Sequence, residues 1–428
     1  MSTETTAAAD VASTFADALD PDTLSALMRS TWTWDDRALR RDLSALLVHV
    51  AAANGPIDAP AVAAAVRATA LSTGVGFVST VLGPHLTADI GSPFRGQFLP
   101  AAGNPTVFRT MASNARAEVR ARAAEYLQTS GTADDYPDEA SWLSLSTSGP
   151  ADLGAAMRAF GHSDSTAPLR GNVGLALQTL RALGADGAEL ARRIERDEVR
   201  STLAAAERNG SWDPALVRTR AVPEMAGWKL TGAKHFVPDA GGADVILIVA
   251  RSVAGPSVFA VDADAPGLRI TPLDTIDPVR PLFTVEVDDA PATLLGREGQ
   301  GGLLMRRAID LAMTALAGEQ VGLLERAIGI LLRQQRAEWP GDELVQTVLD
   351  HATAIALWRR AFEPDAAAGA ATMAHIACSE ASVRVAALAA EIVNDEEAER
   401  LLRRALSASL LLGGPAAYHE RLLERLGI

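Results

Sequence analysis

Hydrophobic residues recur at helical spacing over most of this chain and at strand spacing over one central block. From residue 106 to about 200, and again from 301 to 428, apolar residues return every three or four positions. Between residues 201 and 297 the pattern changes to short alternating runs such as LFTVEVD, residues 282–288. The chain is therefore predicted to be mostly α-helical with one small β domain.

The turn and helix signals predict four domains. Several short strands separated by Pro and Gly favour a small barrel or sandwich, and four long helices with apolar stripes after residue 301 favour a four-helix bundle. The segment GPHLTADIGSPFRGQFLPAAGNP is the best linker candidate because it is rich in Gly and Pro. The predicted domains are a helical N-terminal extension (1–104), an N-terminal helical domain (105–200), a middle β barrel (201–300) and a C-terminal four-helix bundle (301–428).

Composition narrows the class of protein. The 428 residues are 48% hydrophobic and 21% charged, which is ordinary for a globular protein. A net charge of -14 argues against a nucleic-acid partner, which requires a basic face. The single cysteine, Cys378, excludes an intrachain disulfide or a cysteine zinc site, and the seven histidines do not fall into metal-ligand spacing.

Two segments bear on location. The N-terminal MSTETTAAADVASTFADALD lacks the basic and apolar regions of a signal peptide, so a cytoplasmic protein is expected. Residues 68–86 are uncharged apart from His85, but Gly83-Pro84 interrupts them and they are rich in Ser, Thr and Gly. A membrane span needs about 20 mostly apolar residues. A buried helix or helix pair is therefore favoured over a span.

Three segments in combination resemble the acyl-CoA dehydrogenase family. LAAAERNGSWDPALVRTRA, residues 203–221, resembles the family's AEP-x-x-x-WDP segment in the version common in actinobacterial members. GWKLTGAKHFVPDAGGADVILIVAR, residues 227–251, resembles the hairpin of its middle domain. IDLAMTALAGEQVGLLERAIGILLRQQR resembles the first helix of its C-terminal bundle. The resemblance covers roughly residues 105–428 and implies helices, a small β domain and a four-helix bundle.

The resemblance implies an FAD fold in which the flavin ring lies against the β domain. A flat apolar ring needs a rigid wall, and its polar edges need backbone donors. The alternative is that Phe236 and Trp212 are ordinary core residues of the β domain, as most aromatic residues are. On an alternating strand, His235 would point away from Phe236. The cofactor-binding candidates that the resemblance implies are Glu207, Trp212, Phe236, Val237, Pro238 and Gln346.

Two cofactor segments of the family are not visible. After the first bundle helix Arg336 is retained, but the family's Phe-Gly pair is missing. The glycine-rich loop that lets the backbone approach the cofactor phosphates is replaced by EIVNDEEAERLLRRAL. The acidic run 395–397 in that segment would repel a pyrophosphate if it lay beside one. The later pair Gly413-Gly414 falls in the tail segment and is not counted as that loop.

The catalytic residue is unknown from the sequence. Dehydrogenation at the α,β-carbons of a thioester requires a carboxylate base while the flavin accepts hydride. One family position for this base is Ala312 here, and alanine cannot take a proton. Glu319 lies in the seam of the same predicted helix, where packing and helix–helix hydrogen bonding are the first interpretation.

Three functions stay open. The chain is a non-catalytic subunit of a heteromeric FAD-dependent acyl-CoA dehydrogenase, an active flavoenzyme with altered chemistry on a CoA-, carrier- or steroid-type substrate, or a cofactor-free scaffold. In the third case residues 1–100 would fill the space that a ligand once used. The resemblance also implies a homo- or hetero-oligomer formed through the C-terminal bundle, and acyl-CoA as the substrate class.

Overall fold

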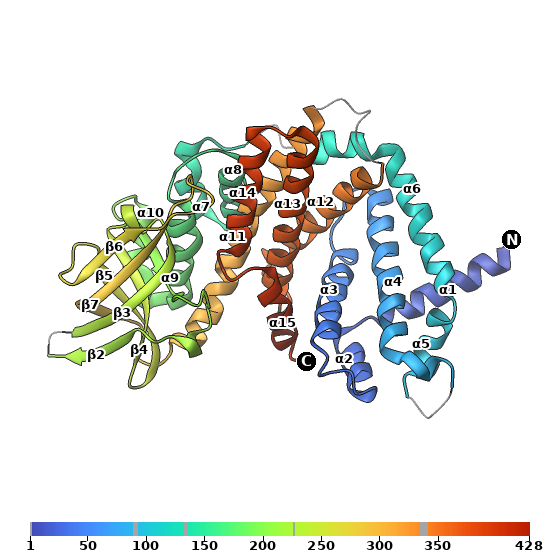
Figure 1. The fold of residues 1–428 in the computed structure, drawn as a ribbon, viewed down its shortest axis with the longest axis horizontal. Coiled ribbons are helices and arrows are strands. Elements are labelled where there is room, and N and C mark those ends of the chain that lie inside the picture. The colour runs from blue at the N-terminus through green and yellow to red at the C-terminus, as the bar shows by residue number, and fades with distance from the viewer. Residues whose placement is uncertain (1, 89–92, 132–135, 226, 334–340) are drawn as a thin grey trace. The chain divides into compact units, whose positions relative to one another are not determined.

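The computed structural model describes residues 2–88, 93–131, 136–225, 227–333 and 341–428. Helices make up most of these residues and a single block of strands lies between them in the chain, which confirms the predicted fold class (Figure 1). Arg336 lies outside the described residues.

Two compact units divide the chain, and each combines segments that are distant in sequence. The first unit comprises Met1–Thr132, Leu332–Ala381 and Pro415–Ile428, and the second comprises Ala133–Leu331 and Ser382–Gly414. The two units do not follow the four segments predicted from the sequence.

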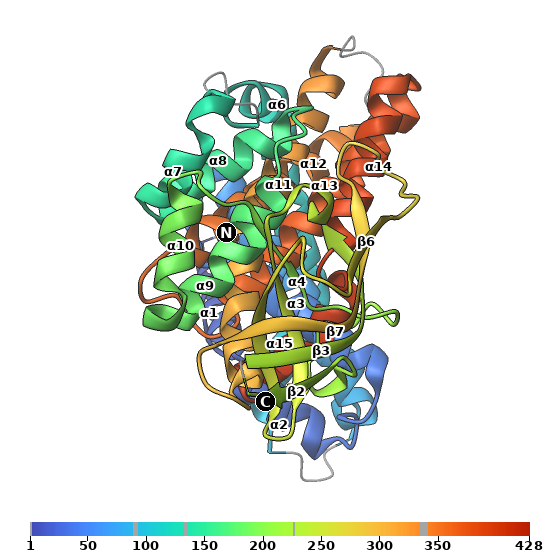
Figure 2. The ribbon, with the colours of Figure 1, turned by 90° about the vertical axis from the view of Figure 1, so that its left-hand side faces the viewer.

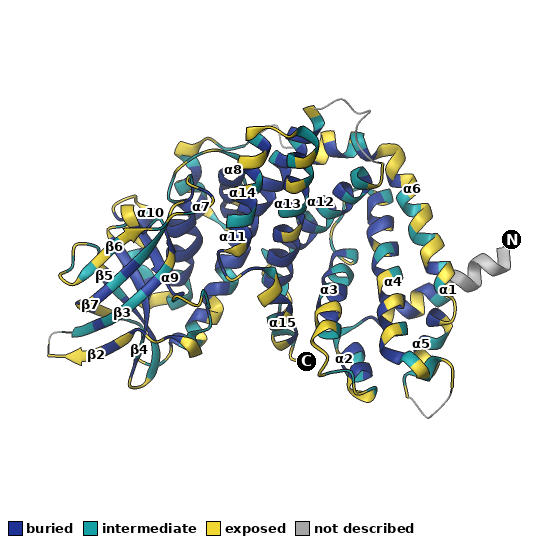
Figure 3. Cartoon of the chain, viewed as in Figure 1, coloured by how far each residue is buried: buried dark blue, intermediate teal, exposed yellow. Residues whose placement is uncertain are grey.

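The first unit consists of helices. Its helices α3, α4 and α6 all pack against α12, and α15 packs against α3. Buried positions follow one face of most of these helices, while α6 is largely exposed (Figure 3). The helices are α1 (Ser2–Asp17), α2 (Pro21–Ser30), α3 (Arg37–Ala53), α4 (Pro60–Leu82), α5 (Arg95–Ala102), α6 (Pro105–Ser130), α12 (Gly341–Ala361) and α15 (Pro415–Leu426).

The predicted linker at residues 83–105 is wrong over much of its length. It contains the 3₁₀ turn η1 (Gly83–Leu86) and α5, and Phe98 on α5 is fully buried. Phe98 and Phe108 both contact Phe15, with ring centroids 6.2 and 5.4 Å away. The Gly and Pro residues here end one helix and begin the next, so the segment belongs to the core of the first unit.

One described helix, Pro60–Leu86, is long and apolar enough to cross a membrane by length and composition alone. Of its most apolar window, 56% is buried inside the protein, and core helices of soluble proteins pass the same test. Phe77 and Val78 of this helix lie in the core of the first unit. The packing therefore agrees with the buried helix expected from the sequence.

A Ser–His–Glu constellation holds three helices of the first unit together. Ser44 Oγ lies 2.9 Å from His419 Nδ1, and His419 Nε2 lies 3.0 Å from Glu380 Oε1. Glu380 comes from α13 (Ala370–Val393), which contributes residues to both units. Ser44 is fully buried, so this arrangement ties α15 to α3 and α13 and gives the hydroxyl no access to a substrate.

The second unit combines helices with the whole β domain. α11 contributes nearly all of its length to this unit. The predicted helices after residue 301 are thus present as α11 to α14, with α12 in the first unit and α14 in the second; their packing as a four-helix bundle stays a prediction. The helices of the second unit are α7 (Trp142–Ser148), α8 (Pro150–His162), the π-helical η3 (Arg170–Leu177), α9 (Gln178–Leu183), α10 (Ala188–Glu195), α11 (Gly301–Arg333) and α14 (Glu396–Leu410).

The seven strands form one sheet, five of whose strands close into a barrel. Pairing runs in the order β1-β4-β2-β3-β7-β5, and β5 pairs back onto β4, so that five strands close a circuit. β3 and β7 lie side by side along most of their length (Figure 2). The buried core of the barrel includes Leu230, Phe259 and Val285. The strands are β1 (Ser201–Ala204), β2 (Arg220–Glu224), β3 (Gly227–Pro238), β4 (Val245–Ser252), β5 (Gly255–Asp262), β6 (Leu268–Pro272) and β7 (Leu282–Leu295).

Glycines allow α8 and α11 to cross in direct backbone contact. A Cβ atom on Gly161 would lie 1.9 Å from the backbone oxygen of Glu319, and one on Gly322 would lie 2.0 Å from that of Arg158. Real Cβ atoms do not approach this closely, so both positions require glycine. The contact fixes where Glu319 lies along α8.

An ion pair buried in the β domain holds the segment before β2 onto β3. Glu207 Oε1 accepts hydrogen bonds from Lys234 Nζ at 3.0 Å, from Thr219 N at 2.8 Å and from Arg218 N at 2.9 Å. Burial alone would raise the pKa of Glu207, but the Thr219 amide and the Lys234 ammonium together lower it to about 2. Lys234 is therefore fully buried within an ion pair.

Gly161→Ala is expected to destabilise the protein by roughly 1–3 kcal/mol because the new methyl group overpacks the helix crossing. Gly302→Ala on α11, where a Cβ meets nothing within 4 Å, should instead be neutral or gain up to about 1 kcal/mol from helix propensity. Urea denaturation of both variants measures the difference. Equal effects of the two substitutions would contradict the close crossing.

Glu207→Gln is expected to cost roughly 3–5 kcal/mol at neutral pH, because it leaves the buried Lys234 ammonium without its charge partner. The folded pKa of Glu207 lies below the ordinary value of 4.5, so its stabilisation is complete above pH 4.5 and is lost as the pH falls towards 2. Melting temperatures of wild type and variant should converge over that interval. Glu286→Gln, which breaks the exposed pair with Arg269, is the control and should change little.

Candidate functional site

A β-bulge turns Phe236 out of the regular alternation of β3. Between Lys234 and Val237, two residues of β3, His235 and Phe236, stand opposite a single residue of β7, Thr284. Phe236 has a φ of 58° and is 40% exposed, both unusual for a bulky aromatic residue. Bulges re-aim side chains in this way beside functional sites. His235 Nδ1 lies 3.2 Å from Thr284 Oγ1, and the expectation from strict alternation does not apply across the bulge.

Phe236 lies in the wall of a cleft of about 490 Å³ in the second unit. Trp212 lines the same cleft, so two of the residues predicted from the sequence come together there. A volume of this size is typical of small-molecule sites. The lining residues come from the segment before β2, the bulge, the β6–β7 loop and the end of α14: Ala206, Asn209, Gly210, Trp212, Phe236, Leu273, Asp274, Thr275, Ile276, Leu282, Ser407, Leu410, Leu411 and Gly413.

Trp212 joins the two sides of the cleft. Its indole Nε1 donates a hydrogen bond of 3.0 Å to the backbone oxygen of Leu411, directly after α14. The ring is almost fully buried. The segment that carries Trp212 is therefore anchored to the helical wall, and the cleft has a fixed floor.

The helical wall ends in two glycines with left-handed backbones. Gly413 has a φ of 110° and Gly414 one of 80°, and Gly413 lines the cleft. A Cβ on Gly413 would meet nothing within 4 Å, so the absence of a side chain leaves space there. From the sequence, the Gly413-Gly414 pair was not counted as a cofactor loop because it falls in the tail segment. The Gly-Gly signal was present, but the sequence did not show that Gly413 lines the cleft.

The β6–β7 loop forms the third side of the cleft, and its residues were not predicted from the sequence. It brings Leu273, Thr275 and Ile276 to the cleft together with Asp274, the only carboxylate among the described lining residues. Asp274 is exposed. Nothing in the sequence marks these residues, because a short run of mixed residues between two strands is typical of any loop.

Three predicted residues serve the β domain itself. Glu207 directs its carboxylate to Lys234 and to backbone amides and is not among the lining residues. Val237 lies in the barrel core. Pro238 is buried, and its carbonyl accepts a hydrogen bond of 2.6 Å from Thr202 Oγ1. These residues support the wall, while Trp212 and Phe236 form it.

Gln346 lies in the other compact unit, on α12. Its Oε1 accepts a hydrogen bond of 3.0 Å from Arg116, and its Nε2 donates one of 2.7 Å to Asp350. Both polar ends of its side chain are thus engaged within the first unit.

Behind the cleft lies a buried cluster of charges centred on Glu319. Arg170 donates two hydrogen bonds to its carboxylate, at 2.6 and 3.2 Å, and Arg280 Nε lies 3.6 Å away. Burial would raise the pKa of Glu319, but Arg170 and Arg280 outweigh it and lower the pKa. The expected helix–helix hydrogen bonding is found, because Arg170 belongs to η3.

The cluster extends to α14 through Arg404. This guanidinium lies 2.8 Å from Asp164 Oδ1 and 3.6 Å from Asp277 Oδ2. Asp277 and Arg280 follow the cleft residues of the β6–β7 loop, and Arg404 precedes the cleft residues of α14. The cluster therefore anchors two walls of the cleft from behind.

The acidic run that replaces the family's glycine loop lies at the beginning of α14. Asp395 caps the helix by accepting a hydrogen bond of 2.8 Å from Ala398 N. Glu396 pairs with Arg400 and Glu397 with Arg326, at 2.8 and 3.4 Å. The cleft lies at the other end of this 15-residue helix, about 20 Å away at 1.5 Å per residue. These carboxylates therefore do not face the cleft.

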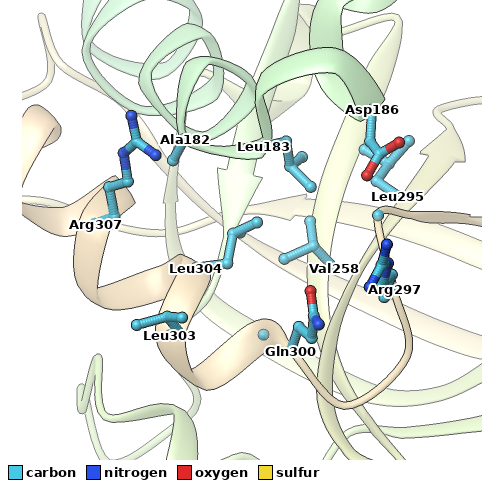
Figure 4. Close-up of a pocket in the computed structure, with 12 residues that line it drawn as sticks. Ala182, Leu183, Asp186, Val258, Leu295, Arg297, Gln300, Leu303, Leu304 and Arg307 are labelled. Carbon is cyan, nitrogen blue, oxygen red and sulfur yellow. The ribbon is translucent and has the colours of Figure 1, made fainter.

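A second cleft of about 370 Å³ lies between α9, the barrel and the beginning of α11 (Figure 4). Leu183, Val258 and Leu304 point into its centre, and Arg297 and Arg307 lie at opposite ends. No group of three or more His, Cys, Asp or Glu side chains that could hold a metal ion occurs among the described residues.

The first cleft fits one part of FAD. Its two aromatic residues and its leucines suit the apolar faces of a flavin ring. Its described lining includes no Lys, Arg or His for a diphosphate. The residues present therefore fit the ring system and do not fit the phosphates.

Comparisons with known proteins agree with this arrangement. Residues 202–288 match the family model of the acyl-CoA dehydrogenase middle domain. Cyclohexane-1-carbonyl-CoA dehydrogenase from Geobacter metallireducens is 29% identical over 156 residues, which is 34% of this chain and 41% of that protein. The chain thus aligns with about two fifths of this relative's length.

Solved structures share the fold over a longer span. The Tcur3481-Tcur3483 steroid ACAD superposes with a TM-score of 0.59 at 23% identity, covering 74% of this chain and 98% of that one. Glutaryl-CoA dehydrogenase from Mycobacterium smegmatis, in complex with FADH2, superposes with a TM-score of 0.58 at 13% identity, covering 72% and 93%. The chain thus contains a match to the acyl-CoA dehydrogenase middle domain, and it shares the fold of solved acyl-CoA dehydrogenases.

Proposed function

We propose that this chain is a non-catalytic subunit of a heteromeric FAD-dependent acyl-CoA dehydrogenase. The observation that carries the proposal is the helical side of the cleft. There α14 and the residues after it contribute Ser407, Leu410, Leu411 and Gly413, and none of these can remove a proton from a carbon atom. In this proposal the chain supplies a wall for the ring, and a partner subunit supplies the base and the phosphate contacts.

Glu319 does not fill the role of the base. Both of its oxygens lie against buried guanidinium groups, and its lowered pKa makes it a weak base. Ala312, the position of the base in part of the family, is buried and carries no titratable group. Both findings favour loss of the proton-transfer step.

The chain's own residues have a definite task in this proposal. When bound, a flavin supplies hydride acceptance. Phe236 and Trp212 orient the ring and exclude water from its face, and Gly413 leaves room for a neighbouring group. Sequestration of this kind strengthens the electrostatic interactions in a site.

The substrate class and the assembly are inferred by likeness. The relative from Geobacter metallireducens is named for a CoA thioester, and the steroid ACAD structure is named for two components. An acyl-CoA substrate and a heteromeric assembly in the cytoplasm are proposed on this basis. Since α3, α4 and α6 cover α12, the proposed contact through the C-terminal bundle would use its other helices.

The cofactor-free scaffold is the least favoured of the three functions. In that case residues 1–100 would occupy the ligand space. The second unit forms the cleft from its own residues, between 206 and 282 and between 407 and 413, and so retains a space of about 490 Å³ for a ligand.

An active flavoenzyme is the second candidate because of Asp274. This carboxylate lies in the cleft wall and is exposed. A carboxylate in a cleft beside a flavin-sized aromatic wall is the minimum that proton abstraction requires.

Titration of the purified chain with FAD should show binding of the ring. The binding is monitored through the flavin absorbance at about 450 nm. Addition of an acyl-CoA should not bleach it, because the helical side of the cleft carries no base and Glu319 is held by buried arginines. Phe236→Ala should weaken binding about 2–10-fold, the effect of one lost aromatic contact. Trp32→Ala, which removes an exposed aromatic residue of the first unit, should change nothing. Stoichiometric FAD that is bleached by an acyl-CoA would end the non-catalytic proposal.

Asp274→Asn should leave stopped-flow traces of the chain mixed with FAD and acyl-CoA unchanged within about twofold, since no proton transfer occurs to be lost. The matched control is Asp264→Asn, an exposed carboxylate of the β domain outside the cleft lining. If wild type shows slow bleaching that falls by about 100-fold or more in Asp274→Asn and persists in Asp264→Asn, the active flavoenzyme is the correct function.

A further inference from the structure

We propose that the cleft between the barrel and α14 selects an uncharged planar ring and excludes phosphate groups from its interior. This inference rests on the proposed function in one respect, namely that the ligand's ring lies against Phe236. It goes further because it assigns a charge preference to the site: the cleft accepts the uncharged ring of a flavin and disfavours the charged phosphates.

The shape and chemistry of the walls favour a flat apolar body. Phe236 stands on a bulge with a left-handed backbone, and Trp212 is locked by its bond to Leu411. Leu282 and Leu410 extend the apolar surface. Aromatic ligands gain from stacked or edge contacts with such side chains.

The fixed charges of the cleft are negative. Asp274 contributes a full carboxylate. α14 ends at Leu410 in the cleft wall, and the carboxyl end of a helix carries a partial negative charge. The described lining includes no cationic side chain to offset either. A phosphate placed inside would therefore meet two negative sources and no counter-charge.

The nearest arginines of the cluster cannot turn towards a phosphate without breaking buried pairs. Arg280 follows the loop residues of the cleft, but its guanidinium lies over the Phe160 ring and beside Glu319. Arg404 on α14 is held by Asp164 and Asp277. Both side chains are buried behind the walls. Removing one partner of a buried pair is strongly unfavourable, so the charge of the cleft is built in.

The second cleft of the same unit has cationic side chains in its lining. It contains Arg297 and Arg307 with one carboxylate, Asp186, and the amino end of α11, which carries a partial positive charge. The lack of cations around Phe236 is therefore a local property of the first cleft and does not describe the whole unit.

The test compares riboflavin, FMN and FAD, which share one ring and differ in phosphate charge. Binding of each to the purified full chain is measured by quenching of flavin fluorescence at low and high salt. Riboflavin should bind at least about fivefold more tightly than FMN or FAD at low salt, and the gap should narrow at high salt as charges are screened. Asp274→Asn should narrow the gap at low salt, whereas Asp264→Asn should leave it unchanged.

Three outcomes would count against the inference. FMN or FAD binding more tightly than riboflavin overturns the charge preference while leaving the proposed ring wall intact. Equal affinities for all three, insensitive to Asp274→Asn, also overturn it. If no flavin binds, or if Phe236→Ala leaves riboflavin affinity unchanged, the ring wall itself is wrong and the proposed function fails with the inference.

Discussion

The buried carboxylate of Glu319 is the interaction on which the second unit depends. It joins η3 through Arg170 and the β6–β7 loop through Arg280, from a helix that crosses α8 at a glycine contact. A buried charge is tolerable only when it is paired and hydrogen-bonded, so each partner is held in place by the cost of separating it. Asp277 and Arg404 extend the same constraint to α14. The cleft lies between elements that this cluster positions.

The same constraint removes Glu319 from chemistry. A catalytic carboxylate needs a free oxygen near its substrate and a pKa close to the working pH. Here two arginines occupy the oxygens and lower the pKa. The residue that best resembles a base in the sequence is thus the most firmly committed to structure. A carboxylate in the seam of a helix is thus not by itself evidence of a catalytic base.

The fold and the two aromatic residues of the cleft could be predicted from the sequence, because they depend on local patterns. Alternation marked the strands, the hairpin resemblance marked Phe236, and the resemblance of residues 203–221 marked Trp212; both aromatic residues line the cleft. The sequence could not show that Glu207 and Val237 support the barrel and do not line the cleft. A pattern does not show which way a side chain points once a bulge shifts the register. Leu273 to Ile276 carried no signal, because only tertiary packing brings that loop to α14.

The acidic run at residues 395–397 shows how position changes the meaning of a charge. In the sequence it stands where relatives place a phosphate-binding loop, and it therefore argues against a cofactor. In the structure it caps and pairs the beginning of α14, a whole helix away from Phe236. The groups that would repel a diphosphate in the cleft are instead Asp274 and the carboxyl end of the same helix. Because these groups line the cleft itself, they oppose a phosphate there while leaving the apolar ring surface untouched.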